Sequence, residues 1–374
     1  MNKNRRRFVQ ASLLGGAAVA TGGLSQTAAA KEEQKTARKN LDILILGGTG
    51  FIGPHMVREA LRRGHTVSLF NRGKSNNTLF PDLKLYKGDR DGGLDVLKGN
   101  KWDAVIDNSG YVPRHVEDSA RALKDVSSQY LYISTIATYA NLTVPTDENS
   151  PLGKLDDETV EEVTGESYGP LKALCEKRAA AQIDADKLTI LRPTYICGPG
   201  DHTDRFTYWP IRTSRGGEML WPGSRDDKTQ IIDVRDLASF TIDCLEQSTS
   251  GVFNTVTPAG EYTMGNLHDD CLAVSASDMQ AVWVSADFLE EQKLLEGREI
   301  PIWAPPAGEY GKVAYVNGEK AVAAGLRNRP VRETARDALA WWNTLPEERT
   351  SKMRAGLAAE QEAATLKLWK EKNG

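Results

Sequence analysis

Two side chains with the right types and spacing to transfer a proton are Tyr168 and Lys172, in the segment Tyr-Gly-Pro-Leu-Lys. Four residues make about one helical turn, so on a helix both side chains share a face. A free phenol has a pKa of about 10 and is a weak base at neutral pH. A nearby ammonium group favours the phenolate and lowers that pKa. The pair therefore predicts proton exchange with a substrate hydroxyl, with Tyr168 as the acid/base.

A glycine-rich turn is the second feature with chemical meaning. Gly47, Gly50 and Gly53 have the spacing G-x-x-G-x-x-G, between the apolar run 41–46 and the helical periodicity of 54–63. One glycine permits the tight bend, another lets the backbone approach a pyrophosphate, and the third lets the helix pack close to the strand. The free N–H groups at the helix start then meet the phosphates. The turn predicts a dinucleotide site, and a positively charged nicotinamide ring would further favour the tyrosine phenolate.

The residues after the second predicted strand bear on the choice of cofactor. An acid there would bind the adenosine ribose hydroxyls, but this chain has Asn71 and Arg72, with Lys74 close by. The guanidinium could pair with the 2′-phosphate of NADP, or it could stack on adenine with NAD bound. The sequence leans toward NADP and leaves NAD open. Asp89, after the third predicted strand, is placed to accept a hydrogen bond from the adenine amino group.

These groups need a scaffold, and the chain shows alternating strands and helices. Apolar strands followed by helical segments predict a parallel sheet covered on both faces. Right-handed crossovers then make the fold α/β, a doubly wound Rossmann sheet. The predicted strands are 41–46, 66–70, 83–86, 104–107, 130–134 and 188–191, and the clearest helices are 54–63 and 114–123.

The chain is predicted to divide into five parts. Tryptophan, proline, glycine and charged residues crowd the segment after about residue 194, which is typical of a substrate-binding lobe. The parts are a signal peptide over 1–30, a linker over 31–40, an NAD(P)-binding Rossmann domain over 41–195, a substrate lobe over 196–344 with a return strand near 230–237, and a C-terminal helix over 345–374.

With Tyr-Ile-Ser-Thr at 132–135 upstream, the chain resembles the short-chain dehydrogenase/reductase superfamily, in its extended branch, the NAD-dependent epimerase/dehydratase family. Within it, residues 69–74 and 168–172 are similar to relatives of chloroplast stem-loop RNA-binding proteins. The resemblance implies that Thr135 hydrogen-bonds the reacting oxygen, with Ser134 as the alternative, and that residues 192–194 line the nicotinamide pocket. It also implies that the lysine modulates the tyrosine and holds the nicotinamide ribose. The predicted catalytic residues are Thr135, Tyr168 and Lys172, and the predicted cofactor-binding residues are Gly47, Thr49, Gly50, Phe51, Ile52, Gly53, Asn71, Arg72, Asp89, Asn108, Ser109, Lys172 and Pro193.

Departures from the family pattern restrict the reaction. Sugar 4,6-dehydratases of the family have an Asp-Glu pair after the catalytic threonine, where this chain has Ile136 and Ala137, which have no proton to give. Nucleotide-sugar epimerases place an asparagine shortly after the Arg-Pro segment, where this chain has Tyr195. These differences argue against a 4,6-dehydratase and against a nucleotide diphosphate sugar as substrate.

Polar groups beside aromatic rings after residue 198 suit a sugar or another polyol, which stacks on rings and hydrogen-bonds at its edges. The alternative is that Trp209 and Trp221 are packing residues and Arg205 forms a surface ion pair. The predicted substrate residues are Asp201, Arg205, Trp209, Gln230 and Arg235.

The N-terminal segment resembles a twin-arginine export signal. Arg5, Arg6 and Phe8 fit the pattern, whereas Gln10 replaces the usual lysine. The uncharged stretch 11–30 is too weakly apolar for a comfortable membrane span and ends in three alanines suited to cleavage. The sequence thus predicts export by the twin-arginine machinery to the periplasm or beyond, with the cofactor loaded in the cytoplasm. A disordered basic tail is the alternative.

Composition and charge exclude several functions. The 374 residues include 47 basic and 51 acidic side chains, and four of the basic ones fall in the first thirty residues. Without that segment the chain is too acidic to favour nucleic acid. Four widely spaced cysteines without C-x-x-C and five scattered histidines predict no metal site. A disulfide is left open, with three ways to pair all four cysteines.

These features together predict an exported NAD(P)-dependent enzyme that acts on a secondary alcohol of a sugar-like substrate. An exported enzyme is cut off from the cytoplasmic pool that recycles nicotinamide cofactors. The sequence therefore favours a redox-neutral epimerase with a tightly bound cofactor. An NADPH-dependent reductase and an inactive binding protein on the same fold are the alternatives, because the fold alone does not distinguish these functions. A homodimer is left open.

Overall fold

The computed structural model describes residues 40–374 apart from 296, 298 and 374. The predicted signal peptide and nearly all of the predicted linker therefore lie outside the described residues. The described residues belong to one compact unit.

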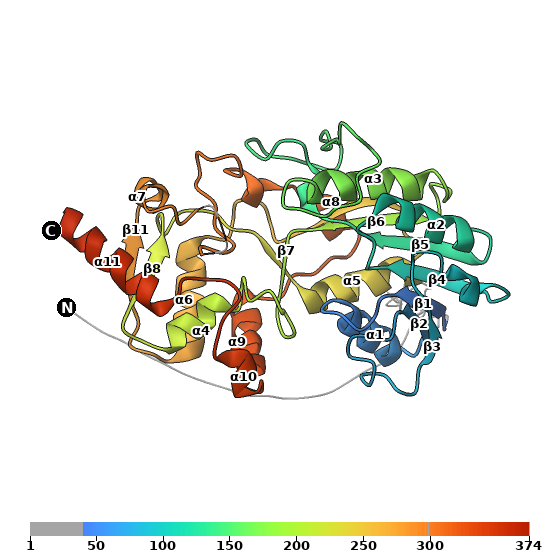
Figure 1. The fold of residues 1–374 in the computed structure, drawn as a ribbon, viewed down its shortest axis with the longest axis horizontal. Helices are drawn as coiled ribbons and strands as arrows, with labels where there is room; N and C mark the ends of the chain where they lie inside the picture. Colours follow the sequence, from blue (N-terminus) through green and yellow to red (C-terminus); the bar gives the residue numbers. More distant parts are fainter. Residues whose placement is uncertain (1–39, 296, 298, 374) are drawn as a thin grey trace, which may run out of the picture. The chain divides into compact units, whose positions relative to one another are not determined.

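A seven-stranded parallel sheet forms the centre of one half of this unit (Figure 1). Its order, β10-β6-β5-β4-β1-β2-β3, runs in both directions from β1, as a doubly wound sheet requires. The predicted fold class is confirmed. The strands are β1 (Asp42–Leu46), β2 (Thr66–Asn71), β3 (Lys84–Lys87), β4 (Trp102–Asp107), β5 (Ser127–Ile133), β6 (Leu188–Pro193) and β10 (Gly251–Thr255).

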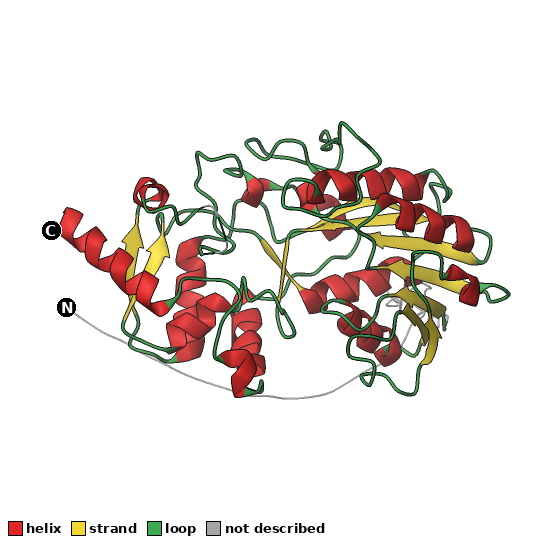
Figure 2. Ribbon diagram, in the orientation of Figure 1, coloured by secondary structure: helices red, strands yellow, loops and turns green. Residues whose placement is uncertain are grey.

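Helices cover both faces of this sheet because its central strands are apolar on both sides (Figure 2). In β1, Ile43 and Ile45 join the core beneath α1 and α5, while Leu44 and Leu46 join the core beneath α2 and α3. Alternate residues of a strand point to opposite faces, so one continuous apolar run serves both cores. These helices are α1 (Gly53–Arg62), α2 (Pro113–Leu123), α3 (Tyr168–Ala180) and α5 (Val234–Glu246).

A second apolar core lies in the other half of the unit. Trp209 and Trp221 are buried at its centre, with ring centroids 4.6 Å apart. A pair of parallel strands and several helices surround them (Figure 1). These elements are β8 (Glu218–Pro222), β11 (Gln280–Val284), α4 (Tyr208–Ser214), α6 (Met264–Ser275), α7 (Ala286–Glu291), α9 (Val331–Trp342) and α11 (Ala359–Asn373).

The predicted return strand near 230–237 is wrong in extent and position. Only Ile231–Asp233 is a strand, β9, and it pairs with β7 (Tyr195–Cys197) rather than with the main sheet. Asp233 then accepts a hydrogen bond from the Arg235 N–H, which caps α5 and turns the chain into a helix. The strand that returns to the main sheet is β10, which pairs with β6.

Other details also differ from the sequence expectations. The C-terminal segment holds two helices, α10 (Glu347–Thr350) and α11, in place of one. All four cysteines are buried and free, so the disulfide left open by the sequence is absent. Within the described part of the chain, no helix has the length and apolar character needed to cross a bilayer. The remaining elements are η1 (Leu94–Leu97), η2 (Ile136–Thr138), η3 (Val313–Tyr315) and α8 (Glu319–Ala323).

Candidate active site

Two adjoining cavities lie at the carboxyl ends of the central strands. The larger has a volume of about 590 Å³ and is lined by the glycine turn and by Thr135, Tyr168 and Lys172. The smaller, about 340 Å³, is lined by the residues that follow β2 and β3. Both are lined by Gly47, Gly50, Ser109 and Tyr111. Together they form the elongated site that a dinucleotide requires, and ligands of open α/β sheets bind at this edge.

The glycine turn fits a pyrophosphate. A Cβ on Gly53 would lie 2.5 Å from the Gly48 Cα, so only glycine lets α1 start so close to the turn. A Cβ on Gly50 would meet nothing within 4 Å, so this residue leaves the groove open. No side chain caps the start of α1, and its first turn contains no acid. Its free N–H groups therefore suit a phosphate.

The smaller cavity carries the predicted adenosine residues. Asn71, Arg72, Lys74 and Asp89 line it together with Thr49. The Asn71 amide donates to the Gly47 carbonyl oxygen at 3.3 Å, and its own oxygen accepts from the Gly73 N–H at 2.8 Å. Asn71 thus shapes the turn and leaves Arg72, which is exposed, free to reach a ligand.

Thr135, Tyr168 and Lys172 meet in the larger cavity although they come from different elements. Thr135 follows β5, while Tyr168 and Lys172 lie one turn apart on α3, as the Tyr-x-x-x-Lys spacing predicts. Burial raises the pKa of the Tyr168 phenol above its ordinary value, and Tyr111 acts in the same direction. The Thr135 hydroxyl and the Arg205 guanidinium oppose this rise. The phenol is therefore protonated at neutral pH until a further positive charge arrives.

Lys172 is 3% exposed and is fixed by its surroundings. Its ammonium nitrogen donates to the carbonyl oxygens of Gly110 at 2.7 Å and Ile133 at 2.6 Å. It also lies 4.2 Å from the ring centroid of Tyr132 and 5.3 Å from that of Tyr111. Burial lowers the pKa of Lys172 to about 8. This lysine stays near the cavity, where a ribose hydroxyl would compete with carbonyl oxygens for its protons.

Ser134, the alternative to Thr135, is engaged elsewhere. Its hydroxyl donates to the Glu176 carboxylate at 2.5 Å. Glu176 forms a buried bidentate pair with Arg192, at 2.9 and 2.6 Å. Arg192 therefore holds α3 against β6 rather than lining the cavity, while Pro193 and Thr194 do line it. Thr135 is left as the hydroxyl that can face a substrate oxygen.

Four of the five predicted substrate residues lie away from the cavity lining. Asp201 is buried and accepts from the Thr203 N–H and hydroxyl through Oδ1. Trp209 packs in the second core, as the alternative interpretation has it, and donates to the Pro301 carbonyl oxygen at 3.2 Å. Gln230 donates to the carbonyl oxygens of Thr257 and Val316. Each of these side chains thus has at least one structural partner, which the composition of the segment did not reveal.

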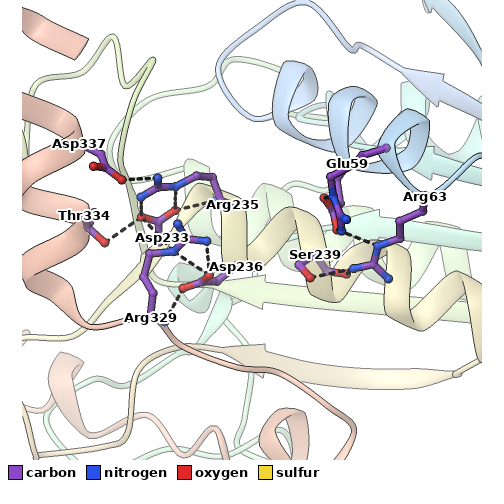
Figure 3. A network of polar contacts seen from close by, with 10 residues as sticks. Glu59, Arg63, Asp233, Arg235, Asp236, Ser239, Arg329, Thr334 and Asp337 are labelled. Carbon is purple, nitrogen blue, oxygen red and sulfur yellow. Dashed lines mark hydrogen bonds and ion pairs between the residues drawn. The ribbon is translucent and has the colours of Figure 1, made fainter. Parts of the chain in front are cut away.

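Arg235, the fourth of these, belongs to a network of charges along α5 (Figure 3). It donates to Asp233 at 2.7 Å and to Asp337 at 2.5 Å, so it joins β9 to α9. Arg329 pairs with Asp236 on the same helix at 2.7 Å. These pairs hold the two halves of the unit together, and the prediction that Arg235 binds substrate is wrong.

Arg205 is the predicted substrate residue that does line the cavity. Its Nε donates to the Thr203 hydroxyl at 3.1 Å, and its guanidinium lies 5.2 Å from the ring centroid of Tyr195. Unlike the surface ion pair considered as an alternative, it forms no ion pair with any described residue. The predicted cofactor residues that line the same cavity are Gly47, Gly50, Phe51, Ile52, Gly53, Asn108, Ser109, Lys172 and Pro193.

Sequence reasoning missed the aromatic and apolar wall of this cavity. Tyr111 follows β4 and Tyr310 lies in a proline- and glycine-rich segment, and both line the cavity. They are 46% and 54% exposed, high values for such large rings. Leu142 and Val313 line it too. Tyr111 lies two residues after Ser109, which the sequence predicts to bind the cofactor, and this is a usable signal, whereas nothing near Tyr310 indicates a site.

The described part of the chain contains no cluster of side chains suited to a metal ion. No group of three or more histidine, cysteine, aspartate or glutamate side chains there lies close enough together to hold a metal ion.

A comparison with known protein families gives a match that includes the residues of this site. Residues 43–256 match the NAD dependent epimerase/dehydratase family. This range includes the glycine turn, Thr135, Tyr168, Lys172 and Arg205, and it makes up more than half of the chain.

Two curated relatives share between a quarter and a third of their aligned residues with this chain. Chloroplast stem-loop binding protein of 41 kDa b from Arabidopsis thaliana is 28% identical over 230 residues, covering 57% of each chain. The 2-alkyl-3-oxoalkanoate reductase of Stenotrophomonas maltophilia is 29% identical over 223 residues, covering 54% of this chain and 64% of that one. The chain thus spans less than two thirds of the length of either relative.

Solved structures show the same fold. The Bordetella bronchiseptica enzyme WbmG, in complex with NAD and UDP, has a TM-score of 0.59 and 19% identity, over 86% of this chain and 98% of that one. At this identity the likeness extends to the fold alone.

Proposed function

The chain belongs to the NAD dependent epimerase/dehydratase family, and on that premise we propose that it oxidises and reduces a secondary alcohol carbon of a small molecule. One observation carries this proposal. Thr135, Tyr168 and Lys172 line the cavity that also contains the glycine turn, so proton-transfer groups and dinucleotide cradle share one space.

When bound, the nicotinamide cofactor accepts or supplies the hydride. Tyr168 takes the proton of the substrate hydroxyl during oxidation and returns it during reduction. Thr135 donates a hydrogen bond to the same oxygen and orients it. Lys172 would hydrogen-bond a ribose hydroxyl of the bound cofactor, and its positive charge near the phenol would favour the phenolate.

We propose that the reaction is redox-neutral and that the protein works outside the cytoplasm. The twin-arginine pattern at Arg5 and Arg6 supports export, to the periplasm or the exterior. An exported enzyme that released reduced cofactor would stop after one turnover. Oxidation to a ketone followed by return of the hydride to the opposite face inverts the carbon without net redox change. Loss of export in the Arg5→Lys, Arg6→Lys variant supports this compartment, and unchanged export contradicts it.

A reductase is the second candidate, and specific observations favour it. The Stenotrophomonas relative is named for the reduction of a 3-oxoalkanoate, and the cavity wall of this chain is largely apolar. A reductase consumes one added NADPH per ketone, whereas an epimerase consumes none. Incubating one enantiomer of a secondary alcohol with the protein as purified, without added cofactor, separates the two. Racemisation supports the epimerase, and an unchanged enantiomer that is formed from its ketone only with NADPH supports the reductase.

The cofactor preference and the nature of the substrate follow from the cavity lining. We propose NADP over NAD, because Arg72 and Lys74 line the adenosine end and their positive charges would favour a 2′-phosphate there. The sugar-like substrate predicted from the sequence rested on five residues, of which only Arg205 lines the cavity. The proposal is therefore limited to a secondary alcohol, and the net negative charge disfavours nucleic acid as a partner.

A further inference from the structure

We propose that the substrate is a small carboxylate with an apolar or aromatic body, and that Arg205 holds its carboxylate beside Tyr168. This inference rests on the proposed function, because it names the class of alcohol that the same cavity takes. Three observations support it: the two terminal nitrogens of Arg205 have no hydrogen-bond partner among the described residues, the loop that carries Arg205 is anchored, and aromatic rings line the cavity.

Arg205 is half-buried in the cavity wall with its charge available. Among the described residues no partner occupies its two terminal nitrogens, since its one hydrogen bond to protein runs from Nε to Thr203. Asp201 influences it electrostatically, but this carboxylate lies beyond ion-pair distance and accepts instead from Thr203. Two parallel N–H groups match the two oxygens of a carboxylate, which makes a charge-assisted bidentate pair.

The loop that carries Arg205 is anchored, so the guanidinium is positioned before a ligand arrives. Asp204, the preceding residue, is fully buried and has a left-handed φ of 62°. Its carboxylate pairs with Arg349 and accepts from the Arg354 N–H at 2.8 Å. The Arg354 guanidinium also donates to the His202 carbonyl oxygen at 2.9 Å. The C-terminal segment thus holds the loop at His202 and at Asp204.

The rest of the wall suits an apolar body better than a sugar. The rings of Tyr111, Tyr195 and Tyr310 line the cavity with Leu142 and Val313. Of the hydroxyl groups nearby, those of Ser134 and Thr203 already donate to Glu176 and Asp201. A sugar would have to set several of its hydroxyls against these ring faces, and each hydroxyl that loses water without gaining a partner costs free energy. An apolar group that covers the exposed faces of these rings removes apolar surface from water, which lowers the free energy of binding.

Arg205 and Tyr168 line the same cavity, so a molecule that fills it faces both groups. The guanidinium charge also lowers the pKa of the Tyr168 phenol, against the larger effect of burial. The Tyr111 ring lies 6.4 Å from the Tyr168 ring, centroid to centroid. With its carboxylate on Arg205, such a molecule would direct its carbinol toward the phenol and its apolar substituent toward the tyrosine rings of the wall.

The test uses the full chain with its cofactor and measures binding by calorimetry. The probes are mandelate, 3-phenyllactate and 2-hydroxyoctanoate, each with the neutral 1,2-diol in which the carboxylate becomes CH₂OH, and methyl glucoside as the sugar. The wild type is expected to bind at least one acid more tightly than its diol and than the glucoside. Arg205→Gln should weaken that acid roughly tenfold to a hundredfold and leave its diol unchanged.

Arg205→Lys keeps the charge without the fork and should recover part of the affinity. The surface variant Arg215→Gln, which removes an exposed charge away from the cavity, should bind like the wild type. Failure of all three acids to bind, or equal affinity in Arg205→Gln and wild type, overturns the inference. Binding through Arg205 without any exchange of hydride would instead overturn the proposed function and leave only the carboxylate-binding role of Arg205 standing.

Discussion

The ammonium nitrogen of Lys172 lies 2.6 Å from the carbonyl oxygen of Ile133, to which it donates a hydrogen bond. Ile133 ends β5, and Thr135 follows two residues later. A second bond runs to the carbonyl oxygen of Gly110, after β4. One buried cation thus ties α3 to the ends of two neighbouring strands. Lys172 therefore fixes the segment that presents Thr135 as well as charging the site.

Stability should depend on pH through Lys172. Its pKa is lowered by burial from 10.5 to about 8, so between these values the unfolded chain holds a proton that the folded chain has released. Stability from this group is then present in full above about 10.5 and lost as the pH falls through 8. Relative to Lys172→Met, the unfolding free energy of the wild type should rise by about 3 kcal/mol across this range. Denaturant unfolding of both proteins measures it, and a pH-independent difference contradicts it.

Tyr168→Phe should abolish proton transfer and leave cofactor binding intact. The phenyl ring still fills the wall beside Tyr111, while the exchangeable proton is gone. Turnover of any alcohol that the wild type accepts should fall by roughly two to four orders of magnitude. Tyr86→Phe, which removes a hydroxyl bonded to Asn100 away from the cavities, is the control and should keep full turnover. Normal turnover by Tyr168→Phe would show that another group is the acid/base.

Arg72→Ala should weaken NADP more than NAD. The variant removes an exposed cation from the adenosine end, and a charge-assisted hydrogen bond is worth roughly a factor of ten to a hundred in affinity. Calorimetric titration of apoprotein with each cofactor gives the ratio. Arg121→Ala, on the surface of α2, should change neither affinity. An equal loss for both cofactors would make Arg72 an adenine contact only.

Arg349→Ala should destabilise the protein strongly. Arg349 pairs with Asp204, whose side chain is 0% exposed, so the variant leaves a buried carboxylate short of its cation. Removal of one partner of a buried pair costs about 3–5 kcal/mol. Arg336→Ala, which breaks an ion pair of a largely exposed arginine with Asp337, should cost under about 1 kcal/mol. Thermal unfolding compares the two, and similar melting temperatures would show that Asp204 is not held by this pair.

The features that the sequence predicts well are local. The apolar run of β1, the glycines and the periodicity of α1 lie within about two dozen residues, so their pattern determines a βαβ start without further information. The Tyr168–Lys172 spacing likewise needs only one helix. These elements carry the fold class and the proton-transfer pair.

Features that depend on contacts between distant segments were not predictable. Gln230 is polar, and for that reason the sequence predicts a substrate ligand. In the structure its amide donates to the carbonyl oxygens of Thr257 and Val316, which lie far from it in the sequence and approach it only in the folded chain. Tyr111 and Tyr310 line one cavity although nearly two hundred residues separate them. They come together only because the loop that contains Tyr310 packs near the carboxyl ends of the strands, where Tyr111 lies.

The central claim is that this cavity holds a nicotinamide dinucleotide tightly enough to support redox-neutral chemistry. The most direct test is to denature the purified protein and assay the supernatant for NAD and NADP, with Gly53→Val as the variant whose Cβ would collide with the Gly48 backbone. The account predicts close to one cofactor per wild-type chain and almost none from the variant. A wild-type protein that releases no cofactor, and binds neither NAD nor NADP when titrated, would contradict it.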